Sequence, residues 1–285
     1  MSFIDAIIQY EFLQKALITS VMVGIICGVI GCFIILRGMA LMGDAISHAV
    51  LPGVAISYML GINFFFGAVA TGVLTAIGIG FVSQNSRLKN DTAIGIMFTA
   101  AFAAGIILIT FMKSSTDLYH ILFGNVLAVR PSDMWVTLAI GLLVIAAVYL
   151  FYKELLVTSF DPTMASAYGL STKIIHYLLM TMLTMVTVAS LQTVGIVLVV
   201  AMLITPAATA YLLTDRLWVM IYLAAVLGAV AAVIGLYFSF TYNLSSGAAI
   251  VLVSTLLFIA VFFFSPKHGF IRRFLKSRKN TAVTG

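Results

Sequence analysis

The sequence predicts an all-α protein built as a polytopic bundle of transmembrane helices. Its 285 residues are 63% hydrophobic and only 8% charged, and the mean hydropathy is +1.19, a composition that cannot be buried in a soluble core of ordinary proportions. The apolar runs reach the roughly 20 residues that a helix needs to cross a bilayer, and they lack the ten-residue alternation of an outer-membrane barrel. We therefore expect eight to ten spans within a single transmembrane domain that covers residues 1–285.

The first apolar segment, at about residues 13–36, is expected to remain in place as a membrane span. It runs without a small-residue cleavage site, which distinguishes it from a removed signal peptide. It also holds both cysteines, Cys27 and Cys32, which form neither a Cys-x-x-Cys pair nor an extramembrane disulfide framework. We interpret the two cysteines as small packing residues.

Eight further apolar segments follow, which makes nine in all. They lie at about residues 41–60, 62–83, 92–112, 132–152, 174–192, 194–213, 217–239 and 247–265. The segments at 41–60 and 194–213 carry proline and small residues near their middle or end. Either of them could therefore be a broken or partial span.

Two of the connecting loops are too long to be simple turns. The loop at 113–130 mixes polar and apolar residues, and we expect a short surface helix or a gate there. In the loop at 153–173, Ser159 or Asp161 can cap a helix, Pro162 suits its first position and Gly169 suits its end. This pattern predicts a short amphipathic helix on one face of the membrane.

The distribution of basic residues predicts the orientation in the membrane. If each segment spans once, all but three of the fifteen Lys and Arg residues lie on the side of the basic tail at 266–285; the exceptions are Lys15, Lys113 and Arg130. Because Lys and Arg mark the cytoplasmic side, we expect the tail and the loop at 153–173 to be cytoplasmic, and the N-terminus to lie outside. The net charge of +6 is concentrated in the tail, where it suits anionic lipid better than nucleic acid.

Asp44 and His48 form the candidate functional site, because ionisable side chains are costly inside a membrane segment and usually face a polar pathway. They are four residues apart, so on a helix they share one face about 6 Å apart along the axis, with Ser47 beside them. A carboxylate oxygen and an imidazole nitrogen suit Mn²⁺, Fe²⁺ or Zn²⁺ better than Cu⁺. Two ligands are too few for a tight site, and a second copy of the chain would supply two more.

The alternative interpretation of this pair is a buried hydrogen bond between Asp44 and His48 that fixes helix packing. The cost of burying two ionisable groups in a membrane favours the transport site over this interpretation. Asp44 also lies only seven residues after Arg37, about 10 Å from the inner edge along a continuous helix. Either the turn at Arg37 lies deeper than this count suggests, or the segment at 41–60 is not a plain span.

Proline and small residues mark two candidate hinges. Pro52 and Gly53 follow the Asp44/His48 pair, and Thr205 and Pro206 lie in the segment at 194–213. Each pair could bend the helix along the pathway or simply allow close packing. The histidines at 120 and 176 are interpreted as interfacial or capping residues.

The chain has no phosphate-binding loop of the type Gly-x4-Gly-Lys-Ser/Thr and no soluble region large enough for a nucleotide. If ATP drives transport, a separate polypeptide must hydrolyse it, and this chain is not itself an enzyme. A membrane metalloprotease is excluded because the sequence contains no His-Glu-x-x-His.

Four groups of residues resemble the membrane permease subunits of ABC importers for manganese, zinc and iron. They are Leu36-Arg37-Gly38 followed by Met42-Gly43-Asp44-Ala45-Ile46-Ser47-His48-Ala49-Val50-Leu51-Pro52-Gly53; Leu122-Phe123-Gly124-Asn125; Ser159-Phe160-Asp161 with Ala165 and Gly169; and Val200-Ala201-Met202-Leu203-Ile204-Thr205-Pro206-Ala207-Ala208. The resemblance runs nearly from end to end.

This resemblance implies a homodimer of permease subunits with the type II importer architecture. It implies two copies of an ATPase subunit, which dock on a coupling helix around Asp161 to Gly169, and an extracytoplasmic metal-binding protein or lipoprotein. It further implies that Asp44 and His48 coordinate the transported metal, with Mn²⁺ the first choice, then Zn²⁺ and Fe²⁺, and that no cofactor is held permanently. The rival hypothesis is a secondary carrier or channel that works alone, with Asp44 and His48 as a proton relay.

Overall fold

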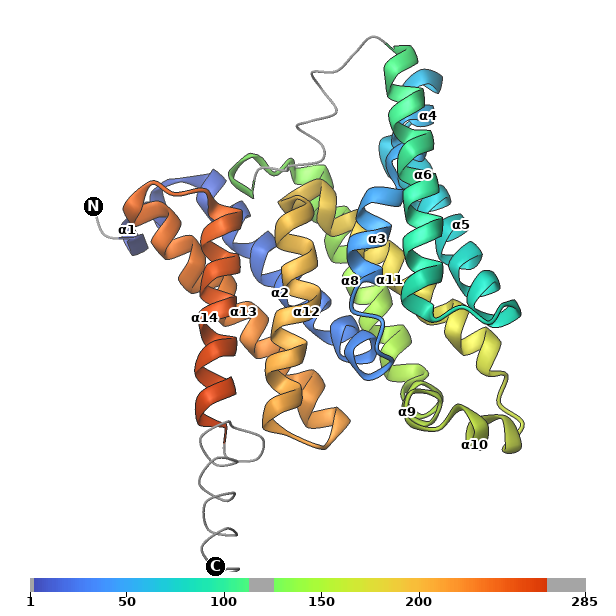
Figure 1. Ribbon diagram of the computed structural model, residues 1–285. Coiled ribbons are helices and arrows are strands. Elements are labelled where there is room, and N and C mark those ends of the chain that lie inside the picture. Colours follow the sequence, from blue (N-terminus) through green and yellow to red (C-terminus); the bar gives the residue numbers. More distant parts are fainter. Residues whose placement is uncertain (1–2, 113–125, 266–285) are drawn as a thin grey trace, which may run out of the picture.

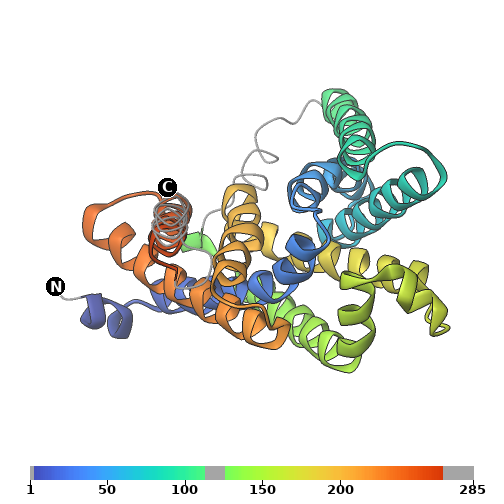
Figure 2. The same ribbon diagram turned by 60° about the horizontal axis from the view of Figure 1, so that its bottom comes forward.

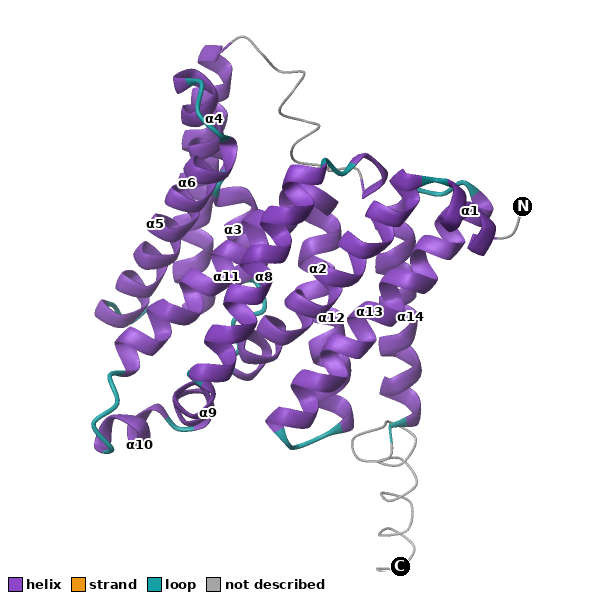
Figure 3. Cartoon of the chain, turned by 180° about the vertical axis from the view of Figure 1, so that it is seen from behind, coloured by secondary structure: helices purple, strands orange, loops and turns teal. Residues whose placement is uncertain are grey.

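The computed structural model describes residues 3–112 and 126–265, and within these residues every regular element is a helix (Figures 1 and 3). The helices in chain order are α1 (Phe3–Gln9), α2 (Glu11–Leu36), α3 (Met42–Ala49), α4 (Leu51–Leu60), α5 (Phe64–Asn85), α6 (Asn90–Met112), the 3₁₀ turn η1 (Val126–Ala128), α8 (Pro131–Leu150), α9 (Tyr152–Phe160), α10 (Pro162–Ala167), α11 (Thr172–Val194), α12 (Ile196–Leu213), α13 (Leu217–Tyr242) and α14 (Ser246–Phe264). The predicted fold class is confirmed.

Eight helices of the described chain are long and apolar enough to cross a membrane; they are α2, α5, α6, α8, α11, α12, α13 and α14. Eight of the nine apolar segments therefore correspond to continuous helices. The ninth, at 41–60, does not, so nine plain spans is a slight overestimate. The segment at 194–213, the other candidate for a broken or partial span, is the continuous helix α12 with Pro206 inside it.

The segment at 41–60 is two short helices, α3 and α4, which meet at Val50. The break lies just before Pro52, because proline has no N–H for the carbonyl of His48 and its ring crowds that carbonyl. Both short helices pack along α6, so together they run lengthwise through the bundle (Figure 1). Of the two explanations offered for the apparent shallowness of Asp44, the structure therefore bears out the second: the segment at 41–60 is not a plain span.

The helices form two groups, with α3 and α11 between them (Figure 2). One group is α4, α5 and α6, which pack on each other; the other is α2, α12, α13 and α14. Helix α3 contacts α5 and α6 on one side and α12 on the other, and α11 contacts α5, α2 and α12. The helix that carries Asp44 and His48 thus occupies the seam between two packed bodies.

Helix α2 is the most buried of the eight long helices, and small residues let its neighbours approach its backbone closely. A Cβ on Gly24 would lie 2.7 Å from the carbonyl carbon of Gly228 on α13, and one on Gly28 would lie 2.7 Å from the carbonyl oxygen of Ala224. Cys27 and Cys32 on the same helix are buried and unbridged, in keeping with a packing role.

The α2–α13 contact predicts opposite effects for the same substitution at two glycines. Gly24→Ala should lower the free energy of unfolding by about 1–3 kcal/mol, because the added methyl meets backbone atoms that cannot move aside. Gly95→Ala on α6, where a Cβ meets nothing within 4 Å, should be neutral or stabilising by up to about 1 kcal/mol. Thermal unfolding of the purified chain in detergent measures both, and equal effects would contradict the assigned contact.

Candidate functional site

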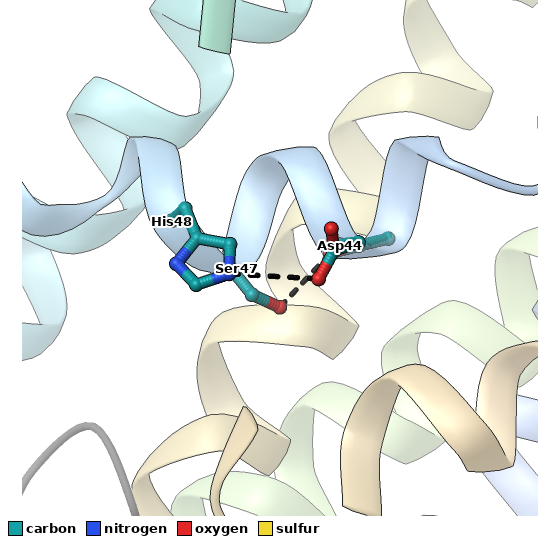
Figure 4. A network of polar contacts seen from close by, with 4 residues as sticks. Asp44, Ser47 and His48 are labelled. Carbon is teal, nitrogen blue, oxygen red and sulfur yellow. Dashed lines mark hydrogen bonds and ion pairs between the residues drawn. The ribbon is translucent and has the colours of Figure 1, made fainter. Parts of the chain in front are cut away.

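Asp44 and His48 project from the same face of α3, one helical turn apart (Figure 4). The Nε2 atom of His48 lies 3.6 Å from Oδ1 of Asp44, which is longer than an ordinary hydrogen bond. The side chain of His48 is 32% exposed, and that of Asp44 is 45% exposed. The pair is therefore neither fully buried nor tightly bonded to itself, and its oxygen and nitrogen are available to a third group.

The His48 ring is held in place by aromatic side chains of α6. Its centroid lies 5.3 Å from that of Phe102 in an edge-on arrangement and 6.4 Å from that of Phe98. On the other side of α3, Gly43 packs against Leu203 of α12. The helix is thus fixed by neighbours from both groups of the bundle, and these contacts restrict the ring of His48.

Ser47 lies beside the pair in sequence, but its hydroxyl is used within the helix. The side chain is fully buried, and Oγ donates a hydrogen bond of 2.9 Å to the carbonyl of Gly43. The structure therefore does not present the Ser47 proton to Asp44 or His48.

No group of three or more His, Cys, Asp or Glu side chains suited to a metal ion occurs in residues 3–112 and 126–265. Within these residues Asp44 and His48 therefore have no third side chain of these types close enough to share a metal ion with them. A full coordination shell around them would need water, backbone oxygens or a second copy of the chain.

The two candidate hinges have different surroundings. Gly53 on α4 crosses Gly67 on α5 so closely that a Cβ on either residue would meet the carbonyl oxygen of the other. This contact favours the packing interpretation for Gly53, and Pro52 accompanies the break at Val50. On α12, Pro206 is buried inside a continuous helix, and the carbonyl of Thr205 accepts a hydrogen bond of 2.7 Å from Thr209.

The loop at 153–173 contains the expected short helix, α10. The Oδ1 atom of Asp161 accepts a hydrogen bond of 2.9 Å from the N–H of Met164, so Asp161 is the N-cap; Pro162 follows as the first helical residue. Gly169 has a φ of +80°, a conformation that favours glycine, and it follows the end of α10. Ala165 is fully buried. The cap, the helix start and the helix end were all predictable from local sequence.

Ser159 is not the cap. It belongs to a second helix of this loop, α9, which the sequence did not predict, and its hydroxyl accepts a hydrogen bond from Arg37.

Three apolar side chains, at the end of α9, within α10 and directly after it, are exposed, and we call them the apolar face of this loop; Phe160 was singled out from the sequence, whereas Met164 and Tyr168 were missed. Phe160, Met164 and Tyr168 are 60%, 49% and 72% exposed. Met164 and Tyr168 lie one helical turn apart, a spacing that could have identified them, whereas the break at Asp161 separates Phe160 from this helix.

Several predicted features lie outside the described residues: the motif at 122–125, His120 and the tail at 266–285. His176 lines a cavity beside the end of α2, together with Arg37 and Lys173.

The comparisons with known proteins agree over nearly the whole chain. The profile of the ABC 3 transport family matches residues 9–265. The manganese transport system membrane protein MntC of Listeria monocytogenes is 69% identical over 279 residues, which cover 98% of this chain and 99% of that protein. The manganese import system permease protein ScaB of Streptococcus gordonii is 54% identical over 274 residues, 96% of this chain and 99% of that one.

Two solved structures resemble the chain. One is a chain of PsaBC from Streptococcus pneumoniae in complex with Fab, which has a TM-score of 0.86 and 52% identity and covers 97% of this chain and 98% of its own. The other is a metal-chelate type ABC transporter in an inward-facing conformation, with a TM-score of 0.70, 15% identity and coverage of 91% and 88%. The second supports the fold alone.

The environment of Ser47 predicts that its hydroxyl is dispensable. Ser47→Ala removes a hydrogen bond that stays within α3, so metal binding should change by less than about 2-fold and stability by about 1 kcal/mol. Equilibrium binding of Mn²⁺ to the purified protein, together with thermal unfolding, checks both values. A loss of binding with unchanged stability would make Ser47 a ligand and contradict this prediction.

Proposed function

The chain belongs to the ABC 3 transport family, and we propose that it is the membrane-spanning permease subunit of an ATP-driven Mn²⁺ importer. The observation that carries this proposal is the high identity, over nearly full length, to permeases named for manganese transport and import. The chain is a multi-pass membrane protein rather than an enzyme, and ATP is hydrolysed by a separate subunit.

In this proposal Asp44 and His48 hold the ion in transit. A cation that has lost part of its hydration shell needs compensating charge and donor atoms, and the Asp44 carboxylate supplies both where the low dielectric strengthens its attraction. The nearby imidazole adds a nitrogen ligand that Mn²⁺, Fe²⁺ and Zn²⁺ all accept. Because ligand type separates these metals poorly, we assign Mn²⁺ from the names of the relatives.

A second permease copy would complete the site. Two identical helices related by a two-fold axis present the same residues to each other, so two Asp44/His48 pairs give two oxygens and two nitrogens. The absence of a third metal-ligating side chain near the pair in the described residues supports this arrangement.

The place of α3 suits alternating access. It lies in the seam between the α4–α6 group and the α2/α12–α14 group and contacts both. A change in the relative position of these groups would therefore alter access to Asp44 and His48 from one side or the other.

We assign the outer side to a metal-binding protein that delivers Mn²⁺, and the inner side to two copies of the ATPase. In a bacterial plasma membrane the tail at 266–285 would then be cytoplasmic. The exposed apolar face at Phe160, Met164 and Tyr168 would dock into the ATPase, while Asp161, Ala165 and Gly169 shape α10 from within.

Loss of either proposed ligand should abolish transport. Asp44→Asn removes the charge and His48→Ala removes the nitrogen, so each should reduce Mn²⁺ uptake into cells by more than about 10-fold. Asp91→Asn, at an exposed carboxylate in the first turn of α6, is the matched control and should transport normally. Normal uptake by folded Asp44→Asn and His48→Ala proteins would contradict the assignment of these residues as metal ligands. ATP-independent uptake by the chain alone in liposomes would instead favour a secondary carrier.

The proposed docking face can be tested by introducing a charge. Met164→Glu should weaken co-purification of the ATPase by more than about 10-fold, because a carboxylate would be buried in an apolar contact, and should leave Mn²⁺ binding unchanged. The control is Leu244→Glu, since Leu244 is 53% exposed in the turn between α13 and α14, at the other end of the helices from α10 (Figure 1). Undiminished co-purification of the Met164→Glu protein would place the ATPase contact elsewhere.

A further inference from the structure

Arg37 joins the segment that leads into α3 to the helix that leads into α10. It follows the last residue of α2, and its Nη2 donates a hydrogen bond of 2.8 Å to Oγ1 of Thr158 on α9. Its Nε donates a second bond of 3.1 Å to Oγ of Ser159. One side chain therefore links two parts of the chain that lie more than 100 residues apart in sequence.

The two hydroxyls are oriented to accept these bonds. Oγ1 of Thr158 donates a bond of 2.7 Å to the carbonyl of Glu154, and Oγ of Ser159 donates one of 2.6 Å to the carbonyl of Leu155. Because each hydroxyl proton is committed to the backbone of α9, each oxygen offers lone pairs to the guanidinium. Through these two hydroxyls, Arg37 is connected to the backbone of α9 and not only to its flexible side chains.

The guanidinium is partly buried and is held by neutral groups. Burial lowers the pKa of Arg37 to about 10, so the side chain remains charged at neutral pH. Within the described residues Arg37 forms no ion pair, since the salt bridges found there join Lys15 to Glu11 and His48 to Asp44. Charge-assisted bonds to hydroxyls hold the two helices together without the full attraction of a buried ion pair.

Few other contacts connect α10 with α3. Helix α10 packs on α9 and α11, whereas α3 packs mainly on α4, α5, α6, α11 and α12. Movement of α10 can therefore reach α3 either through α11 or through α9 and Arg37. The second route is short, because four residues after Arg37 lead to the start of α3 at Met42, and Asp44 lies in its first turn.

A cavity of about 570 Å³ lies beside the link. Its lining includes Arg37, Thr158 and Ser159, together with Pro162 of α10 and Lys173 and His176 of α11. This region is therefore not close-packed, and α9 and α10 have space in which to shift.

From this geometry we infer that Arg37 is a positioning residue that transmits movement of α9 and α10 to the Asp44/His48 helix. The inference rests on the proposed function, in which α10 contacts the ATPase and Asp44 and His48 hold the ion. Arg37 touches neither ATP nor metal. Its role is to make the position of α3 depend on the position of α9.

The test uses the full complex, with ATPase and metal-binding protein, in lipid nanodiscs. ATP hydrolysis is measured with and without Mn²⁺-loaded binding protein. Arg37→Gln should reduce the stimulation by Mn²⁺ by about 2- to 30-fold, the range typical of substitutions in coupling elements. Co-purification of the ATPase and equilibrium binding of Mn²⁺ should stay unchanged. Arg37→Lys, which keeps a charged donor, should restore part of the stimulation.

A second variant removes the acceptors instead of the donor. Thr158→Val combined with Ser159→Ala should reproduce the loss of stimulation, and adding Arg37→Gln should cause little further loss, because all three residues form one link. Arg87→Gln, at an exposed residue in the turn between α5 and α6, is the control and should behave as wild type.

Full Mn²⁺ stimulation in Arg37→Gln, or in the Thr158→Val/Ser159→Ala variant if the first does not fold, overturns the inference. Equal losses of stimulation and Mn²⁺ binding would also overturn it, because they would indicate a purely structural role. Failure of the proposed function can be distinguished from failure of this inference alone, because the wild-type chain would then not co-purify with an ATPase. In that case the inference falls with the function on which it rests.

Discussion

The cost of placing a carboxylate and an imidazole among apolar helices is the constraint on which the structure of this protein depends. Asp44 and His48 do not lie on one of the eight long helices but on the short helix α3, which ends at the break near Pro52. The contacts of α3 come from α6 on one side and α12 on the other, while the pair itself stays partly exposed. The break keeps the polar residues in the seam and allows the chain to continue through the bundle as α4.

The packing on the two sides of this seam explains how the fold can be rigid within each group and still permit movement between them. Close contacts of small residues, such as Gly24 with Gly228 and Gly53 with Gly67, hold the backbones within each group. Helices α5 and α6 share no extensive contact with α13 or α14 (Figure 2). Because close-packed interiors shift as bodies rather than deform continuously, movement is expected at the seam, where α3 lies.

In the loop that follows α8, the residues that define helix α10 differ from the residues whose side chains are exposed to a partner. Asp161 and Gly169 define the ends of α10 and Ala165 fills its buried side, so their substitution would change the helix itself. The side chains of Phe160, Met164 and Tyr168 remain available to a partner. Arg37 follows α2, precedes α3 and bonds to α9 of this loop, so it connects the proposed docking face with the proposed metal site.

The sequence by itself determined the features that depend on composition or on neighbouring residues. These are the helical membrane class, the positions of the long helices, the shared face of Asp44 and His48, and the cap and end of α10. Tertiary structure decided the features that depend on distant residues: the seam around α3, the partner of Ser159 and the link made by Arg37. The break within 41–60 belongs partly to each class. Pro52 indicated the break from the sequence, but only the packing of α3 and α4 along α6 determined how the two short helices run through the bundle. The physical reason is that capping and periodicity act over about one helical turn, whereas contacts such as Arg37 with Thr158 join residues that no local pattern connects.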